Sequence, residues 1–378
     1  MKNRESNFEL MRVISMLFIV MWHILLHGNY INNCSQQSLR IFFTLIQFII
    51  IVHVNSFVLL SGYFQSKNYF KLHKLFNLFI QVIFYAEVLL IIAIKIGIAN
   101  NITLAMHINN FLPSTISNYW FINCYIIVYI LSDYLNKFIN KLDYKEFKYF
   151  LLLLFMVFSV LPYFSGQRFI SNNGYTFYNF IFLYFIGAFL RMYPLNKSDI
   201  LKKFSKNSYK LILITIFILC AIINFLLNNF AFSSIVDGSL LKDISTKIGS
   251  NFLSYSSPFV IIQTITYFEL FNNMKLANNK FINFLSLNTF GVYLIHDNNY
   301  VRAFLYKYLK IDNGLNTIAG YQSIIKLFLF TIGIFVACAI IESARKLIEK
   351  VIMKIPFIKK KILKIKNYFN NFKINLVW

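Results

Sequence analysis

Charged residues are scarce in this chain, and acidic residues are the scarcest of them. Only 13% of the 378 residues are charged, and 14 are acidic, whereas soluble proteins carry about 25% charged residues. Hydrophobic residues make up 58% of the chain and aromatic residues 19%. The scarcity of charge excludes an ordinary soluble protein, and the composition indicates an all-α polytopic membrane protein.

Cysteine is also rare, and the four cysteines are isolated from one another. Cys124, Cys220 and Cys338 fall in apolar stretches, and Cys34 lies outside them. None belongs to a CxxC pair or to a zinc-ligand spacing, so we expect neither a disulfide framework nor a metal knuckle.

Signals for further domains and for processing are absent as well. The first apolar segment lacks a small-residue cleavage site and contains ionisable residues, so we interpret it as a retained membrane span and not as a signal peptide. No convincing repeat or low-complexity linker divides the chain. We therefore expect one integral membrane domain over residues 1–343, followed by a basic amphipathic cytoplasmic tail over residues 344–378.

Ten apolar stretches have lengths suited to crossing about 30 Å of hydrocarbon. They cover residues 10–28, 39–63, 74–99, 118–136, 148–165, 175–192, 209–228, 252–271, 281–300 and 321–343. If the N terminus is cytoplasmic, about three quarters of the 37 lysines and arginines fall in the inner loops, the inner span ends or the tail. This bias follows the positive-inside rule and predicts ten spans with both termini in the cytoplasm.

The net charge of +23 would suggest a nucleic-acid partner for a soluble protein. Here the positions of the basic residues account for the charge, and we expect no nucleic acid to bind. The tail from Arg345 alternates basic and apolar residues at helical spacing. We expect it to lie on the anionic inner leaflet, where each Lys or Arg contributes ~1 kcal/mol; recognition of an acidic partner is the alternative.

The first span, residues 8–27, carries four ionisable residues: Glu9, Arg12, His23 and His27. Such groups are costly in hydrocarbon and usually have a function there. Arg12 and His23 are eleven residues apart, which is three helical turns plus about 20°, so they share one face at a separation of roughly 16 Å. Glu9 is three residues before Arg12, within reach of an ion pair that would fix the guanidinium.

Four motifs occur in a fixed order from the first span to the ninth. They are Arg12 with His23 after ten intervening residues; NSFVLLSGYF at residues 55–64; NYWFINCYIIVYIL at residues 118–131; and LNTFGVYLIH at residues 287–296. Together they resemble the membrane-bound acyltransferase-3 family, in which Arg, ten residues and His mark the first span. Glu9 matches an acidic residue that often precedes the Arg in that family.

The resemblance implies that an acyl group, usually acetyl, passes from cytoplasmic acyl-CoA to a sugar hydroxyl on or near the outer side. The phosphates of CoA require fixed cations at the inner face, and the candidates are Arg12, Lys71 and Lys74. His23 is the candidate catalytic residue. It is either a general base for the acceptor hydroxyl or a nucleophile that forms a transient acyl-imidazole.

The other motif residues are expected to support the substrates. Asn55, Ser61 and Gly62 belong to the second motif, and we expect Ser61-Gly62 to end the second helix and let its backbone approach the donor. Tyr119 and Trp120 are expected either in an interfacial aromatic belt or stacked on a sugar ring. In the last motif, which contains Tyr293, His296 is expected to orient a substrate, to relay a proton or to hydrogen-bond between helices.

Two departures from the family pattern affect the expected donor site. The family commonly has R-x-x-R after the Ser-Gly pair, where this chain has Lys71-Leu-His-Lys74, so charge is kept but the planar fork of arginine is lost. The Ser-Tyr of the last motif is Thr289-Phe290 here, which removes a hydroxyl.

The remaining intramembrane polar residues suggest weaker hypotheses. His23 and His27 have the i, i+4 spacing of a metal-binding pair, but no third ligand has a recognisable spacing, so we predict no metal. His53 is expected to be structural, and Glu87 is expected to face Arg12 or another basic side chain.

The sequence thus predicts a multi-pass O-acyltransferase of a bacterial plasma membrane. The resemblance implies that it uses acyl-CoA, usually acetyl-CoA, and acts on a capsular, exopolysaccharide or lipid-linked glycan. A transporter or flippase of lipid-linked sugars is one alternative, although it gives no reason for the Arg12–His23 spacing. A polysaccharide polymerase is another, although such enzymes place their key groups in a large outer loop.

Overall fold

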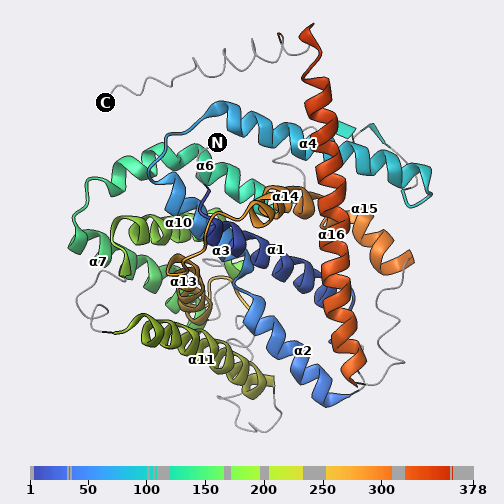
Figure 1. The fold of residues 1–378 in the computed structure, drawn as a ribbon. Coiled ribbons are helices and arrows are strands. Elements are labelled where there is room, and N and C mark those ends of the chain that lie inside the picture. Colours follow the sequence, from blue (N-terminus) through green and yellow to red (C-terminus); the bar gives the residue numbers. More distant parts are fainter. Residues whose placement is uncertain are drawn as a thin grey trace.

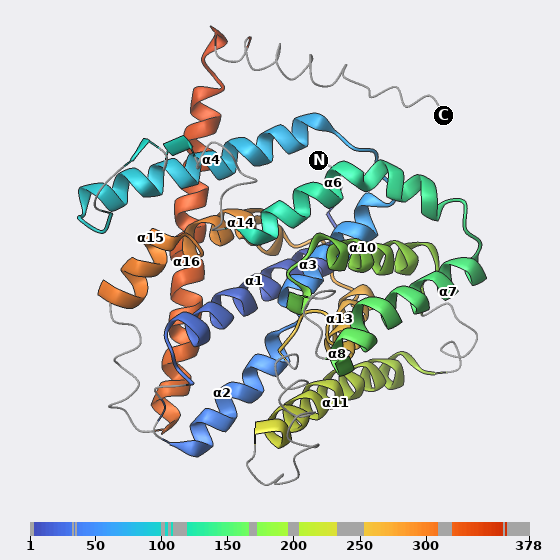
Figure 2. The same ribbon diagram turned by 180° about the vertical axis from the view of Figure 1, so that it is seen from behind.

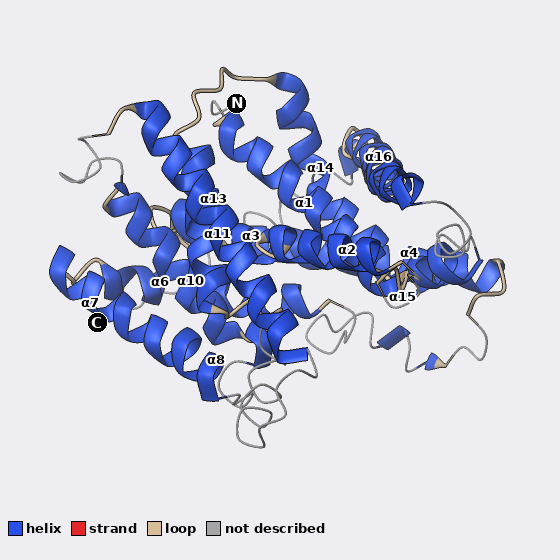
Figure 3. Cartoon of the chain, turned by 90° about the horizontal axis from the view of Figure 1, so that it is seen from below, coloured by secondary structure: helices blue, strands red, loops and turns tan. Residues whose placement is uncertain are grey.

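All regular secondary structure in the described part of the chain is helical (Figure 3). The structure is a computed structural model that describes residues 4–31, 34, 36–99, 103–104, 107–108, 119–165, 172–195, 204–232, 253–308, 320–357 and 360. The all-α class predicted from the composition is therefore confirmed.

The longer helices follow the apolar stretches of the sequence (Figures 1 and 2). They are α1 (Ser6–His27), α2 (Gln37–Ile50), α3 (His53–Gln65), α4 (Leu72–Lys95), α6 (Trp120–Ile139), α7 (Tyr144–Phe155), α10 (Phe177–Met192), α11 (Lys206–Phe232), α13 (Pro258–Asn272), α14 (Lys280–His296) and α16 (Gly320–Ile352). Shorter segments are a π-helical turn (Met156–Val160), α8 (Leu161–Ser165), a 3₁₀ turn (Asn172–Gly174), α15 (Asn299–Arg302) and a second π-helical segment (Ala303–Tyr308).

Six helical segments among the described residues are long and apolar enough to cross a membrane. They are Ser6–His27, Gln37–Gln65, Leu72–Lys95, Tyr144–Phe164, Lys206–Asn228 and Tyr321–Ile352. The protein is thus a multi-pass membrane protein. Helices α6, α10, α13 and α14 occupy the other four predicted spans but are not among the six, so the count of ten and the orientation of the termini stay predictions.

The second predicted span is not one continuous helix, because the chain bends between α2 and α3. Two residues, Ile51 and Val52, separate these helices. The Gln263 side chain on α13 donates to the carbonyls of Phe48 and Ile49 at 3.1 and 3.4 Å. His53 Nδ1 lies 2.7 Å from the Ile50 carbonyl. Backbone groups within a bilayer need partners inside the protein, and these two side chains supply them at the bend.

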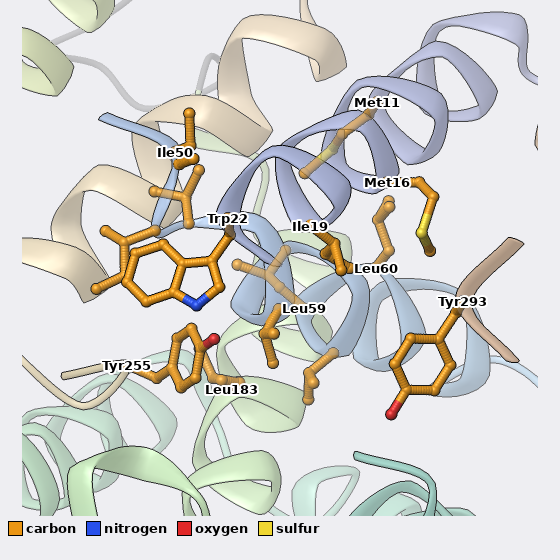
Figure 4. Packing of buried hydrophobic residues seen from close by; sticks show 14 of the residues in the cluster. Met11, Met16, Ile19, Trp22, Ile50, Leu59, Leu60, Leu183, Tyr255 and Tyr293 are labelled. Atoms are coloured by element: carbon orange, nitrogen blue, oxygen red, sulfur yellow. The ribbon is translucent and has the colours of Figure 1, made fainter. Parts of the chain in front are cut away.

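Helix α1 lies in the middle of the molecule (Figures 1 and 2) and contacts α2, α3, α13, α14 and α16. Met11, Met16, Ile19 and Trp22 project from it into the main hydrophobic core (Figure 4). A helix that is apolar on most sides is expected to be buried. The polar residues of α1 are therefore placed deep within the bundle and next to several other helices.

Helices α3 and α10 approach each other closely through two glycines. A Cβ atom at Gly62 would lie 2.1 Å from the Tyr184 carbonyl oxygen, and one at Gly187 would lie 2.1 Å from the Leu59 carbonyl oxygen. Small residues allow such close approach in membrane helix pairs. The expectation that Ser61-Gly62 ends the second helix is wrong, since α3 continues to Gln65 and Gly62 packs against α10.

The first basic residues of the predicted tail belong to α16, which runs without a break to Ile352. Arg345 and Lys346 pair with the buried Glu342 one turn earlier, at 2.8 and 3.2 Å. Glu342 also accepts a hydrogen bond from Tyr85 on α4 at 2.5 Å. The C-terminal part of α16 is thereby fixed to α4. The tail from residue 361 lies outside the described residues.

Candidate active site

A cavity of about 340 Å³ lies beside α1 and is lined by both Arg12 and His23. Its walls come from α1, α3, α4, α6, α14 and the segment that precedes α13. The rise of an α-helix separates the two residues by roughly 16 Å along α1. One face of a single helix therefore presents a cation at one end of the cavity and an imidazole at the other, as the spacing in the sequence predicts.

Arg12 is held by an ion pair and by an aromatic ring. Its guanidinium donates to Glu9 at 2.7 Å and lies 5.4 Å from the ring centroid of Phe64. Glu9 in turn accepts from Arg4 at 3.3 Å and from Ser286 on α14. The Arg12 side chain is 26% exposed. The guanidinium is thus fixed in place but still open to an anionic ligand, and the predicted Glu9–Arg12 pair is present.

His23 is joined to His296 by a hydrogen bond that determines which ring nitrogen carries the proton. His296 Nδ1 lies 2.6 Å from the Val292 carbonyl oxygen, which can only accept. In neutral His296 the Nε2 atom is then an acceptor, and it lies 3.0 Å from His23 Nδ1. His23 therefore donates from Nδ1, and its Nε2 carries the lone pair. A base or a nucleophile requires such a lone pair.

A carboxylate that the sequence analysis did not select lies beside His23. Asp297 Oδ1 is 3.5 Å from His23 Nδ1 and 3.8 Å from Arg302, and the Asp297 side chain is only 7% exposed. A carboxylate in this position stabilises the imidazolium that forms when His23 takes a proton. The sequence contained one indication of its role, because a carboxylate within a predicted membrane span is energetically unfavourable and is seldom without a function.

Three groups of the types that ligate metals converge near His23. One ligand atom each of His23, His27 and Asp297 lies within 4.8 Å of the others, so folding supplies the third group that the i, i+4 histidine pair lacked in the sequence. Arg302, however, donates to His27 Nε2 at 3.1 Å and faces Asp297. Its guanidinium places a positive charge next to two of the three groups, His27 and Asp297, and would repel a bound cation.

Aromatic residues line the end of the cavity at which His23 lies. Trp120 and Tyr255 stack with centroids 5.9 Å apart and an angle of 24°, and both face the cavity. The Tyr255 hydroxyl lies 3.2 Å from Nε2 of His53, which also lines the cavity. His53 was expected to be purely structural; its Nδ1 does bond the backbone at the bend, but its ring also forms part of the wall.

Tyr119 does not belong to a lipid-facing aromatic belt, because it is buried. Its hydroxyl donates to the Leu294 carbonyl at 2.7 Å and accepts from Asn298 at 3.1 Å. These two bonds fix the end of α14 on either side of His296 and Asp297. Tyr119 therefore supports the site from behind, whereas Trp120 contributes to the wall.

Some of the other predicted site residues line or support the cavity, and others lie away from it. Ser61 lines the cavity, and Asn55 donates to the Tyr255 carbonyl at 2.8 Å, which positions that wall. Lys71 and Lys74 do not line the cavity, and both are exposed at the start of α4. Glu87 faces a basic side chain other than Arg12, since it pairs with His107 at 2.9 Å.

Comparison with known proteins shows that a family model described as an acyltransferase domain matches residues 5–343 of the chain. Neither curated proteins nor solved structures give a match.

Proposed function

The chain belongs to the membrane-bound acyltransferase-3 family, and from this membership we propose that it transfers an acyl group from acyl-CoA to a glycan hydroxyl. The donor is cytoplasmic acyl-CoA, with acetyl-CoA as the first candidate. The acceptor is a cell-surface polysaccharide or its lipid-linked precursor, reached from the outer side of a bacterial plasma membrane. The observation that carries the proposal is the single cavity that Arg12 and His23 share.

The dimensions of the donor support this arrangement. The arm of CoA between its pyrophosphate and its sulfur contains about thirteen bonds, which span roughly 15 Å when extended. Arg12 and His23 are separated by roughly 16 Å along α1. With the pyrophosphate at Arg12, the thioester would reach His23. Met16, Ile19 and Leu60 line the cavity as well and would contact the methyl and methylene groups of the arm.

Basic residues outside the cavity complete the proposed donor site. Arginine is well suited to bind a pyrophosphate because its planar guanidinium donates two parallel hydrogen bonds. Lys71 and Lys74 are exposed at the start of α4 and would attract the 3′-phosphate as point charges. Their place outside the cavity lining suits the nucleotide part of CoA, which is too bulky to enter with the arm.

The proposed chemistry uses His23 as a general base. Its Nε2 takes the proton of the acceptor hydroxyl while the hydroxyl oxygen attacks the thioester carbon. The bond between carbon and sulfur then breaks, and the CoA thiolate takes the proton from the imidazolium, so that an ester and free CoA are the products. An acyl-imidazole would form at the same Nε2 atom. Mass spectrometry of enzyme incubated with labelled acetyl-CoA alone, kept at neutral pH and without acid, would detect it on His23.

The test uses labelled acetyl-CoA, membranes that contain the full-length protein, and the host glycan. We expect wild type and His107→Ala, a matched histidine change outside the cavity, to label the glycan. We expect His23→Ala to lose at least ~10²-fold in rate, because a positioned general base contributes 10²–10⁴-fold. Unchanged labelling in His23→Ala would contradict its role.

The same preparation separates the transferase from a transporter of lipid-linked sugars. Purified wild-type protein that transfers no acyl group and binds no CoA, but moves a lipid-linked sugar across vesicles, would favour the transporter.

A further inference from the structure

Tyr293 is the buried residue of the site whose hydroxyl lacks a defined partner. It lies on α14, one turn before His296, and is only 7% exposed. It lines the cavity together with His23 and Asp297. Among the described residues its hydroxyl makes no hydrogen bond of acceptable geometry. A buried polar group without a partner is rare in native proteins, which suggests that a ligand atom completes this one.

The neighbouring tyrosines behave differently. Tyr119 gives its hydroxyl hydrogen to the Leu294 carbonyl, and Tyr255 pairs with His53. Both hydroxyls are occupied by the protein, so neither is free to bind a substrate without breaking an existing bond. Tyr293 therefore differs from them, because its hydroxyl lines the cavity without a hydrogen bond of acceptable geometry to the described residues.

The ring of Tyr293 is held in place by aromatic contacts. It meets Tyr119 at 5.8 Å and 60° and Phe121 at 5.8 Å and 68°, both in edge-to-face geometry. Figure 4 shows the side chain directed away from the packed residues of α1. Asp297, which also faces His23 and Arg302, is a charged neighbour that interacts with the hydroxyl, so a substrate oxyanion would compete with this carboxylate for the hydroxyl proton. The phenol is thus rigid and oriented before a substrate arrives.

We propose that Tyr293 is a catalytic residue that donates a hydrogen bond to the oxyanion of the acyl-transfer intermediate. This inference rests on the proposed function. When the acceptor oxygen adds to the thioester carbon, the carbonyl π electrons move onto its oxygen, and that oxygen becomes the acceptor that the hydroxyl lacks. Tyr293 keeps its proton throughout. When the carbonyl re-forms, the electrons of the carbon–sulfur bond leave with the thiolate, which is protonated by His23.

Placed oxyanion donors act through the transition state and not through binding. Removal of one such donor costs about 10²–10³-fold in kcat, whereas ground-state binding changes little, because a thioester carbonyl is a weaker acceptor than an oxyanion. Tyr293→Phe removes only the hydroxyl and keeps the aromatic contacts, so it isolates this contribution.

The experiment compares wild type, Tyr293→Phe and Tyr163→Phe as full-length proteins in proteoliposomes with acetyl-CoA and the glycan. We expect kcat of Tyr293→Phe to fall by about 10²-fold, with the KM for acetyl-CoA and the Kd for CoA within about twofold of wild type. Tyr163→Phe removes a similarly buried hydroxyl, which bonds Asn224 at 3.2 Å outside the cavity, and is expected to keep kcat within about twofold of wild type.

Three results would overturn the inference. One is an unchanged kcat in Tyr293→Phe. Another is a rise in KM with kcat preserved, which would make Tyr293 a binding residue. A third is a shifted pH profile with an unchanged plateau rate, which would mean that the hydroxyl serves Asp297 instead. An active wild type with an equally active Tyr293→Phe refutes only this inference, whereas a wild type that transfers no acyl group refutes the proposed function as well.

Discussion

At the scale of single residues, the site depends on pairs in which one member fixes the other. Glu9 holds Arg12, and His296 fixes the proton of His23 on Nδ1. Each anchoring residue is itself bonded to another group, Glu9 to Ser286 and His296 to the Val292 carbonyl. Catalytic groups need such support, because small errors in position cost large factors in rate.

The first prediction concerns Arg12. If Arg12 binds the pyrophosphate, Arg12→Ala removes a charge-assisted bidentate contact, which contributes about 1.5–3 kcal/mol, so the Kd for CoA should rise about 10- to 100-fold. Arg12→Lys keeps the charge and should recover part of the affinity. Titration calorimetry of purified protein with CoA measures both. Arg40→Ala, a change of an exposed arginine outside the cavity, is the control, and equal affinities for all variants would return Arg12 to a role in membrane orientation.

The second prediction concerns His296 as a positioning residue. His296→Ala removes the acceptor for His23 Nδ1, so the imidazole loses the bond that selects its tautomer and orientation. We expect kcat to fall by about 10²-fold while the KM for acetyl-CoA stays near the wild-type value. A merely structural role would instead lower thermal stability and change both constants together. Steady-state kinetics with thermal melting of the same preparation separates the two outcomes.

At the scale of elements, broken and closely packed helices shape the cavity. The bend between α2 and α3 places His53 in the wall and frees carbonyls that His53 and Gln263 then satisfy. Asn55, on the first turn of α3, holds the backbone of Tyr255 in the opposite wall. The apolar run over residues 39–63 predicts one span, and hydropathy alone gives no sign of the bend.

The third prediction tests the contact between α3 and α10. Gly62→Ala places a methyl group against the backbone of Tyr184, and overpacking of this kind costs about 1–3 kcal/mol. Gly333→Ala on α16 is the matched control, because a Cβ atom there meets nothing within 4 Å and alanine favours a helix by about 1 kcal/mol. Thermal unfolding in detergent should show a loss for the first variant and no loss for the second. Equal melting temperatures for the two variants would mean that α3 and α10 move apart to accommodate the methyl group without loss of stability.

At the scale of the whole molecule, the fold places α1 so that its two ends lie in different chemical environments. Helix α1 lies in the middle of the bundle (Figure 1), and its cation and its imidazole line a cavity whose other walls come from neighbouring helices. The arrangement keeps the two ends distinct. Arg12 lies with Glu9 and Arg4, and His23 lies with Asp297 and Arg302. The two ends of one cavity therefore present different chemical groups, as the proposed transfer between a donor and an acceptor would require.

The sequence by itself determined the helical class, the existence of many membrane segments and the shared face of Arg12 and His23. These features depend on hydropathy and on helical periodicity, which are local properties of the chain. It also identified His296 and Tyr293 through the last motif, although their partners were unknown.

Only the tertiary structure decided what faces His23. Asp297, His27 and Arg302 approach it because α14 and α15 pack beside α1, and no local pattern specifies contacts between residues more than 270 positions apart. The structure likewise placed Lys71 and Lys74 outside the cavity and moved Gly62 from a helix end to a helix contact. Long-range packing, which depends on side-chain shape and on satisfying buried polar groups, decided those positions.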